Sequence, residues 1–205
     1  VIAPAMDAGM FGHPATEDNV RRLTERGAYF IGPEPGRLAS GLIGKGRFTE
    51  PKDILGHLRV ILSQSGKLDN LKVMLTAGPT REKLDPVRFL TNPSSGKQGY
   101  EIAQALLDAG AEVTLVSGPT QIEAPIGVEL VSVSSSQDML EAVMEEIADV
   151  DVFISVAAVA DFRPKERSTE KIKKTGESMT LELEATADIL MTVAKWSNEN
   201  NPDLR

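Results

Sequence analysis

The sequence predicts an α/β fold whose larger part is a doubly wound parallel sheet, and three observations lead to this prediction. After residue 71, segments typical of strands, loops and helices alternate, as in parallel strands joined by crossover helices. The apolar runs Val73-Met74-Leu75 and Val152–Val156 lack the alternation of a half-exposed strand, which indicates a sheet covered on both faces. A polar stretch over residues 63–71 separates two apolar parts, and we interpret it as a linker between two domains.

Residues 1–62 have the pattern of the C-terminal part of a first α/β domain. We expect the chain to be a fragment, because it begins on an apolar strand pattern without Met and stops without a terminal cap. The predicted elements are a strand at Val1–Ala5, a helix at Glu17–Arg26, a strand at Ala28–Ile31, a Gly-rich loop from Gly32 to Phe48, and a helix at Pro51–Leu62.

Residues 72–205 form the second predicted domain. Its elements follow each other in the order expected of a parallel sheet with crossover helices. They are strands at Lys72–Ala77, Glu112–Ser117, Val128–Val133 and Val152–Ala157, and helices at Lys97–Ala109 and Gln137–Ile147.

Composition excludes several classes of protein. The 205 residues carry 22 Lys and Arg against 30 Asp and Glu, a net charge of −8, which argues against a general nucleic-acid coat. No apolar run approaches the ~20 residues needed to cross a bilayer, so no membrane partner is expected. Without cysteine there is no disulfide framework and no thiolate chemistry, which is compatible with a reducing compartment.

Open parallel sheets bind ligands beyond the carboxyl ends of their strands, so the loops at those ends are the candidate site. After the first strand a long insert leads to Asn92-Pro93-Ser94-Ser95-Gly96-Lys97. Ser95 and Gln98 have capping-box spacing, and a helix start with hydroxyls and a lysine suits an anion. A merely well-capped helix explains Ser95 and Gly96 equally well, but long loops in compact domains are usually functional.

Two later segments are further candidates. Ala157 and Ala158 are small enough for a flat ring to lie against the backbone, and Asp161 is placed for a ribose hydroxyl or a metal-bound water, although a solvated Asp is the simpler interpretation. The lysine-rich stretch 171–174 could neutralise a polyphosphate or be a solvated face. If it serves an anionic ligand, its lysines should converge with Lys97.

Other motifs favour ordinary structural roles. We interpret Ser117-Gly118-Pro119-Thr120 as a turn, and His13 and His57 as structural because neither has a ligand-spaced partner. Pro4–Met10 follows the first strand, and its methionines could face a flavin or fill the core. A nicotinamide-binding oxidoreductase remains the runner-up, since glycines and alanines surround the predicted helix 97–109, but no G-x-G-x-x-G directly follows the first strand.

The motifs together resemble a known family. Five segments occur in the order of the phosphopantothenate-cysteine ligase domain of bifunctional coenzyme A biosynthesis flavoproteins, and two earlier ones resemble the end of the flavodoxin-like decarboxylase domain that precedes it. The ligase motifs are Thr76–Glu82, Asp85-Pro86-Val87-Arg88, Asn92–Lys97, Ala157–Phe162 and Lys171-Ile172-Lys173-Lys174; the decarboxylase motifs are Pro4–Met10 and Leu38–Arg47.

The resemblance implies a Rossmann-like ligase domain that joins 4'-phosphopantothenate to cysteine with CTP and Mg²⁺. It also implies FMN in the decarboxylase domain, a cytoplasmic homo-oligomer, and no nucleic-acid partner. By similarity, Asn92 would hold the acyl-cytidylate and Lys171 would offset charge on the phosphates. The implied nucleotide contacts are Gly78, Ser94, Ser95, Gly96, Ala157, Ala158, Asp161, Asp188 and Ile189, and the decarboxylase motif residues are Met6, Asp7, Met10 and the substrate-clamp Ser40.

Two departures concern the decarboxylase part. The best-known decarboxylases of the resembling family carry Asn where this chain has Asp7, and Cys where it has Ser40. A serine cannot perform a thiol redox step. We therefore expect no decarboxylase activity from this chain, and a non-enzymatic flavoprotein module is a further alternative. In the ligase part, Thr186-Ala187 stands where the family often has Asn-Pro, next to the contact expected from Asp188.

Overall fold

A computed structural model describes residues 1–64, 66–174, 176 and 178–205. Contacts between Cα atoms divide the chain into two units, Val1–Leu62 and Ser63–Arg205, and each is described by itself. Ser65, within the predicted linker 63–71, lies outside the described residues. No helix in the described part of the chain is long and apolar enough to cross a membrane.

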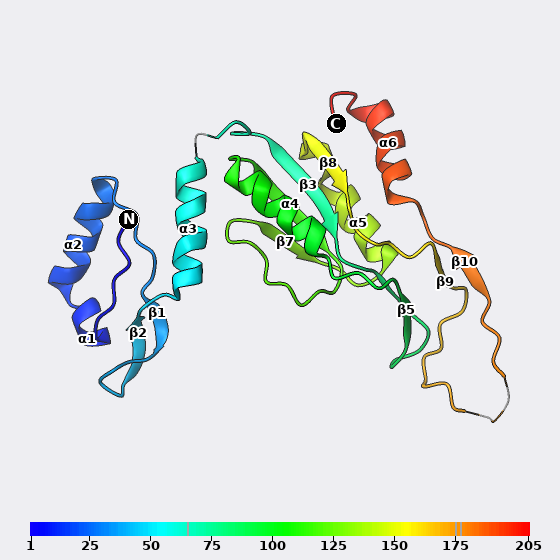
Figure 1. The fold of residues 1–205 in the computed structure, drawn as a ribbon, viewed down its shortest axis with the longest axis horizontal. Coiled ribbons are helices and arrows are strands. Elements are labelled where there is room, and N and C mark those ends of the chain that lie inside the picture. The colour runs from blue at the N-terminus through cyan, green and yellow to red at the C-terminus, as the bar shows by residue number, and fades with distance from the viewer. Residues whose placement is uncertain (65, 175, 177) are drawn as a thin grey trace. The chain divides into compact units, whose positions relative to one another are not determined.

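The first unit consists of helices α1 to α3 and the hairpin β1–β2 (Figure 1). The strands predicted at Val1–Ala5 and Ala28–Ile31 are wrong, because these segments meet through a single parallel bridge between Ile2 and Phe30 and form no continuous ladder. The predicted loop Gly32–Phe48 instead folds as an antiparallel hairpin, whose turn contains Gly41 at φ 85°. The elements are α1 (Ala8–Phe11), α2 (Pro14–Glu25), β1 (Glu34–Arg37), β2 (Ile43–Arg47) and α3 (Pro51–Ser63).

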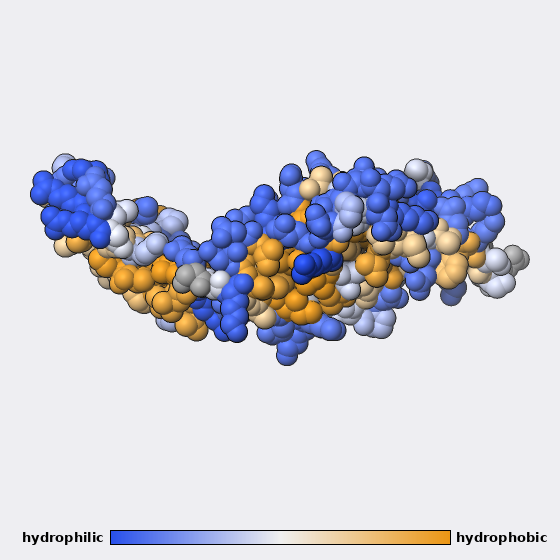
Figure 2. Space-filling model, turned by 90° about the horizontal axis from the view of Figure 1, so that it is seen from above, coloured by the Kyte–Doolittle hydropathy of each residue, from blue (hydrophilic) through white to orange (hydrophobic). Residues whose placement is uncertain are grey.

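This unit buries little apolar surface of its own. Among its large apolar side chains, Ile31 and Leu38 are buried, whereas Ile43 is 86% and Leu62 is 80% exposed. Figure 2 shows apolar residues gathered along one side of the unit. Exposed apolar patches are typical of interaction surfaces and ligand-binding grooves.

The second unit is built on a four-stranded parallel sheet of order β7-β6-β3-β8. The predicted strands Lys72–Ala77 and Glu112–Ser117 are confirmed as β3 and β6, while β7 (Glu129–Ser132) and β8 (Val152–Ser155) are shorter than predicted. Strand β8 ends before Val156 because the Thr76 hydroxyl accepts hydrogen bonds from Val156 N and Ala157 N, each at 3.2 Å, in place of a ladder partner.

Helices cover both faces of this sheet, so the predicted doubly wound fold is confirmed (Figure 1). On one face, Val73 and Leu75 of β3 pack with α4 (Lys97–Asp108). On the other face, Met74 packs with α5 (Ser136–Glu146) and with α6 (Ile189–Asn200), and a short 3-10 turn (Ile147–Asp149) follows α5.

Two small antiparallel pairs lie outside the main sheet. Strand β4 (Arg81–Lys83) pairs with β5 (Phe89–Thr91), and β9 (Phe162–Pro164) pairs with β10 (Leu183–Ala185). Each strand has three residues, too few for a two-residue alternation to be recognised, and the sequence analysis predicted none of them. All four strands follow the carboxyl ends of β3 and β8 in the chain, so they belong to the loops that form the candidate site.

Helix α5 begins with a capping box. The Ser135 hydroxyl accepts a hydrogen bond from Asp138 N at 3.1 Å, and the Asp138 carboxylate accepts one from Ser135 N at 2.9 Å. The bond from the Ser135 backbone is the largest of the causes that hold the pKa of Asp138 below its ordinary value of 3.8.

Replacing Asp138 by Ala is expected to lower the free energy of unfolding by about 1 kcal/mol near neutral pH, as losing a helix cap usually does. Because the pKa of Asp138 is lower in the folded protein than in the unfolded chain, its contribution to stability is complete at a pH above the unfolded-state pKa. The contribution is lost as the pH falls through the folded-state pKa. Urea denaturation should therefore show a smaller difference between variant and wild type in acid. Glu145→Ala, exposed on the same helix, is the control; an equal loss there, or a loss independent of pH, would contradict the prediction.

Candidate functional site

The carboxyl ends of β3 and β8 form the topological switch point of the sheet. From β3 the chain proceeds to β6 and β7 on one side, whereas β8 lies on the other side of β3. The loops beyond the two strands stay in register: Ala158 N donates to Gly78 O at 2.8 Å, and Thr80 N donates to Ala158 O at 3.3 Å. Ligands of open α/β sheets bind at such a switch point.

Threonine hydroxyls connect the two loops further. The Thr80 side chain is fully buried, and its hydroxyl accepts a hydrogen bond from Ala160 N at 2.9 Å. The Thr91 hydroxyl donates to Thr80 O at 2.6 Å, and the Thr186 hydroxyl donates to Ala160 O at 2.5 Å. These bonds satisfy backbone groups that no strand ladder satisfies, so they hold the loop conformation.

Asn92 joins the insert after β3 to the loop after β8. Its amide nitrogen donates to Val159 O at 3.0 Å and to Ala158 O at 3.4 Å. The two residues that it contacts are 66 and 67 positions away in the sequence. The side chain predicted to carry chemistry is therefore a bridge across the switch point.

A cavity of about 320 Å³ lies along the loop after β8 and the start of α6. The structure brings together here five residues that the sequence analysis named. They are Ala157, Ala158, Asp161, Asp188 and Ile189. One oxygen of Asp188 accepts a hydrogen bond from Met191 N at 2.8 Å and so caps α6, whereas the exposed Asp161 has no such local role among its described contacts.

A second cavity of about 380 Å³ lies beside the start of α4. Asn92, Ser94 and Ser95 line it, and so do Pro119 and Thr120, from the segment interpreted as a turn. Because Asn92 lines this cavity and contacts carbonyls of residues that line the first, the two cavities adjoin the same bridge.

The predicted capping box of Ser95 and Gln98 is wrong. Gly96 is the residue that caps α4, in the left-handed conformation at φ 76° and without a side-chain cap. The Ser94 and Ser95 hydroxyls instead accept weak bonds from Gly96 N and Lys97 N, each at 3.3 Å. A left-handed cap turns these successive N–H groups to one side, which is the arrangement of an anion-binding nest.

Gly78 lines neither cavity and has a packing role. Its φ is 71°, and a Cβ there would lie 2.8 Å from Thr120 Cγ2 and 2.9 Å from Gly118 O. The loop after β3 therefore approaches the loop after β6 more closely than any side chain at this position allows.

Replacing Gly78 by Ala is expected to destabilise the second unit by the strain of a left-handed alanine plus about 1–3 kcal/mol for the clash. Gly176 is the matched control, because its φ of 91° gives the same strain while a Cβ there meets nothing within 4 Å. Urea denaturation of both variants separates the two effects. Equal losses in the two variants would contradict the packing role.

The lysine-rich stretch is exposed and anchored at one point. Lys97, Lys171, Lys173 and Lys174 are all exposed, and their convergence on a ligand stays a prediction. Ile172, between the first two lysines of the stretch, hydrogen-bonds through its backbone to Asp85 and Arg88. The sequence predicts no role for Asp85 or Arg88 beyond their place in the motif Asp85-Pro86-Val87-Arg88.

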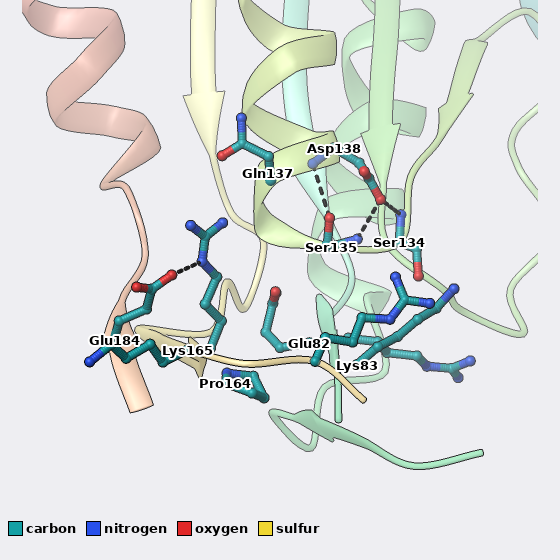
Figure 3. A pocket seen from close by; sticks show the side chains of 12 residues that line it. Glu82, Lys83, Ser134, Ser135, Gln137, Asp138, Pro164, Lys165 and Glu184 are labelled. Atoms are coloured by element: carbon teal, nitrogen blue, oxygen red, sulfur yellow. Dashed lines mark hydrogen bonds and ion pairs between the residues drawn. The ribbon is translucent and has the colours of Figure 1, made fainter. Parts of the chain in front are cut away.

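A third cavity, of about 400 Å³, was not predicted. It lies at the start of α5, and Figure 3 shows the side chains that line it. The buried Glu82 accepts a hydrogen bond from Ser136 N at 2.9 Å. The signal in the sequence is the alternation of basic residues in two segments. These basic residues are Arg81 and Lys83 on β4, Arg163 on β9, and Lys165 directly after β9. Three carboxylates also line the cavity, and one of them, that of Glu184, is paired with Arg163 at 2.8 Å. The cavity lining therefore carries charges of both signs.

In the first unit, Met6, Asp7 and Ser40 line a cavity of about 380 Å³. The Ser40 hydroxyl donates to the Asp7 carboxylate at 2.6 Å, and this bond, with one from Gly9 N, lowers the pKa of Asp7 below its ordinary value. Met10 is 61% exposed and lies outside the lining of this cavity.

His13 caps α2 through Nδ1, which accepts from Ala15 N at 3.2 Å.

No group of three or more His, Asp or Glu side chains in the described part of the chain is arranged to hold a metal ion. A divalent cation at the switch point would therefore need ligands from a bound molecule as well as from a carboxylate such as Asp161. This arrangement is the usual one for Mg²⁺, which binds one or two carboxylates together with substrate phosphates.

Comparison with known proteins gives two family matches. Residues 68–202 match the family model of the DNA/pantothenate metabolism flavoprotein C-terminal domain, and residues 1–62 match the flavoprotein family model. Among curated proteins, the coenzyme A biosynthesis bifunctional proteins CoaBC of Vibrio parahaemolyticus and Bacillus subtilis are each 45% identical, over 200 and 201 residues. Each match covers 97% of this chain and 50% of the relative, so the chain spans about half the length of these relatives.

Two solved structures are similar to a large part of the chain. The C-terminal domain of a CoaBC protein is 51% identical with a TM-score of 0.56, covering 64% of this chain and 61% of that one. The DNA/pantothenate metabolism flavoprotein from Streptococcus pneumoniae is 28% identical with a TM-score of 0.58, covering 66% of this chain and 67% of that one. With its parallel sheet and these matches, the chain belongs to the DNA/pantothenate metabolism flavoprotein family, whose C-terminal domain it carries at residues 68–202.

Proposed function

We propose that residues 63–205 carry the nucleotide site of a phosphopantothenate-cysteine ligase that acts in coenzyme A biosynthesis. The observation that carries this proposal is the Asn92 bridge. Its amide lies between a cavity at the helix start 94–96 and a cavity lined by Ala157, Ala158 and Asp161. A nucleotide needs both an anion-binding nest for phosphates and a pocket of small residues for its ring, and these adjoin here.

The proposed reaction has two steps. A carboxylate oxygen of 4'-phosphopantothenate attacks the α-phosphorus of CTP, the bond to the β-phosphate breaks, and pyrophosphate leaves. The amine of cysteine then attacks the acyl carbon, CMP leaves with the bonding electrons, and the amine loses a proton as the amide forms. Neither step needs a protein nucleophile, so the chain's contribution is positioning and the neutralisation of charge.

Each proposed residue has a separate role in this scheme. Asn92 fixes the loop after β8 and presents its remaining polar atom to the acyl-cytidylate, and Lys171 neutralises charge on the phosphates. Ser94, Ser95 and Gly96 form the phosphate-binding helix end, whose nest N–H groups are those of Gly96 and Lys97. Asp188 caps α6 and thereby places Ile189 on the cavity wall. A bound Mg²⁺ would supply charge neutralisation on the triphosphate, and Asp161 is the carboxylate placed to meet it.

For residues 1–62 we propose a part of a flavin site. The cavity lined by Met6, Asp7 and Ser40 also has apolar walls from Leu38 and Phe48, against which a ring system would fit. FMN, when bound, would supply redox chemistry at this cavity, although Ser40 in place of a cysteine keeps our expectation that this chain performs no decarboxylation. The hydrogen-bonded pair of Asp7 and Ser40 places a carboxylate in the lining of that cavity.

The proposal is tested in the full-length protein with CTP, Mg²⁺, 4'-phosphopantothenate and cysteine. Pyrophosphate release should require both CTP and 4'-phosphopantothenate, and release of CMP in amounts matching the amide product should require cysteine as well. Pyrophosphate release without 4'-phosphopantothenate, or no product with any nucleoside triphosphate, would contradict it. The family resemblance also implies a homo-oligomer, which light scattering of the same protein checks.

A further inference from the structure

Asp85 is a buried carboxylate in the turn between β4 and β5, and its oxygens are fully used within the chain. The residue is 1% exposed. One oxygen accepts hydrogen bonds from Val87 N at 2.9 Å and Arg88 N at 2.8 Å. The other accepts from Arg88 Nε at 2.9 Å and Arg88 Nη2 at 2.5 Å. A buried charge is stable only when it is paired and hydrogen-bonded, and the two-pronged guanidinium contact meets that need.

The same pair also holds one residue of a distant segment by both of its backbone groups. Ile172 N donates to the Asp85 carboxylate at 3.2 Å, and Ile172 O accepts from Arg88 Nη2 at 2.8 Å. These contacts span 87 and 84 positions of sequence. The bonds from Arg88 are the leading cause that holds the pKa of Asp85 far below its ordinary range, so the carboxylate stays charged at neutral pH.

A second contact ties the same segment to the same turn. Ser168 N donates to Leu84 O at 3.0 Å, next to Asp85. Within the segment, the Ser168 hydroxyl donates to Glu170 O at 2.6 Å and accepts from Glu170 N at 3.3 Å. Residues 168–172 have no helix or strand of their own. Their backbone is therefore ordered by the turn that contains Asp85 and Arg88.

Fixing Ile172 fixes its neighbours. The peptide groups on both sides of Ile172 are held, so the Cα atoms of Lys171 and Lys173 have set positions although their side chains are exposed. We infer that Asp85 and Arg88 are positioning residues, which hold the lysine-rich stretch in place for the ligase reaction. This inference rests on the proposed function for the role of Lys171, but the clamp on Ile172 can be measured without it. The gain to catalysis is that the lysine need not be ordered in each turnover.

The clamp itself is tested by limited proteolysis of the full-length protein with trypsin, with the cut bonds identified by mass spectrometry. Arg88→Lys keeps the charge but cannot make the two-pronged contact and reach Ile172 O at once. Losing a charge-assisted hydrogen bond should speed cleavage after Lys171 and Lys173 by about tenfold or more. Arg163→Lys, which alters the ion pair with Glu184 instead, is the control. Equal cleavage rates in wild type and Arg88→Lys would overturn the inference.

The effect on the reaction is tested by a double-mutant cycle. If Arg88 acts through Lys171, Arg88→Lys should lower kcat about tenfold or more in the wild type and have no further effect on kcat in a Lys171→Ala background. Losses that simply multiply would overturn the positioning role. Urea denaturation of Arg88→Lys shows whether the variant stays folded; if it does not, Asp85→Asn replaces it in both tests.

The two tests separate this inference from the proposed function. If Lys171→Ala leaves turnover unchanged while Arg88→Lys still exposes the lysine-rich stretch to trypsin, the proposed role of Lys171 fails and the clamp stands. If Arg88→Lys leaves the stretch protected, the clamp fails whatever the protein catalyses.

Discussion

Lys171→Ala in the full-length protein is expected to lower ligase turnover by roughly 10²–10³-fold, as losing one group that stabilises transition-state charge usually does. The lysine is exposed, so the substitution removes charge without opening a cavity in the core. The loss should appear in kcat more than in the KM for 4'-phosphopantothenate, because the charge that it offsets develops as pyrophosphate departs. Steady-state assay of pyrophosphate release measures both quantities.

The matched control for this variant is Lys195→Ala. Lys195 is also exposed. It lies on α6, further along the helix than Asp188, Ile189 and Leu190, which line the cavity at the start of α6. The protein has a net charge of −8, so removing any lysine weakens its attraction for an anionic nucleotide slightly. A similar loss of turnover in both variants would show a general charge effect and contradict a specific role for Lys171.

The second large effect is expected from Asn92→Asp. The change replaces a donor amide by a carboxylate that faces two carbonyl oxygens, Val159 O and Ala158 O. It removes the donor to both carbonyls, of which Ala158 O keeps its bond from Thr80 N, and it adds a negative charge beside the proposed triphosphate site. We expect the affinity for CTP to fall by about tenfold to a hundredfold, and ligase turnover to fall with it.

Titration calorimetry measures the affinity, and urea denaturation measures how much of the change comes from a weakened fold. Asn198→Asp makes the same chemical change on the exposed face of α6 and is the control. If Asn92→Asp bound CTP as tightly as the wild type, Asn92 would be a structural bridge alone.

The sheet could be predicted from the sequence because its signal is local and strong. The bounds of β3 and β6 were predicted to the residue. In β3 the signal was an apolar run without alternation, and Val73 and Met74 pack on opposite faces of the sheet, so successive residues are all apolar. The end of β8 could not be predicted, since a hydroxyl from a neighbouring strand, that of Thr76, takes the N–H groups of Val156 and Ala157. Thr76 lies 80 positions before Val156, so the residues near Val156 in the sequence do not reveal this contact.

The candidate site shows the same division. Ala157 and Asp161 were found from the loop that follows a strand, and they do line one cavity. The helix cap was wrong because the spacing of Ser95 and Gln98 is ordinary, and the left-handed backbone of Gly96 moves the cap by one residue. The clamp of Asp85 and Arg88 on Ile172 depends on contacts across more than 80 positions, which no local pattern reveals.

The central claim is that the carboxyl edge of this sheet binds a nucleoside triphosphate, and the most direct measurement is calorimetric titration of the full-length protein with CTP and Mg²⁺, with ATP and NADPH in parallel. The account predicts binding of CTP that is weakened in Asn92→Asp and unchanged in Asn198→Asp, with no comparable binding of NADPH. Binding of NADPH in place of CTP, or CTP binding indifferent to Asn92, would contradict it.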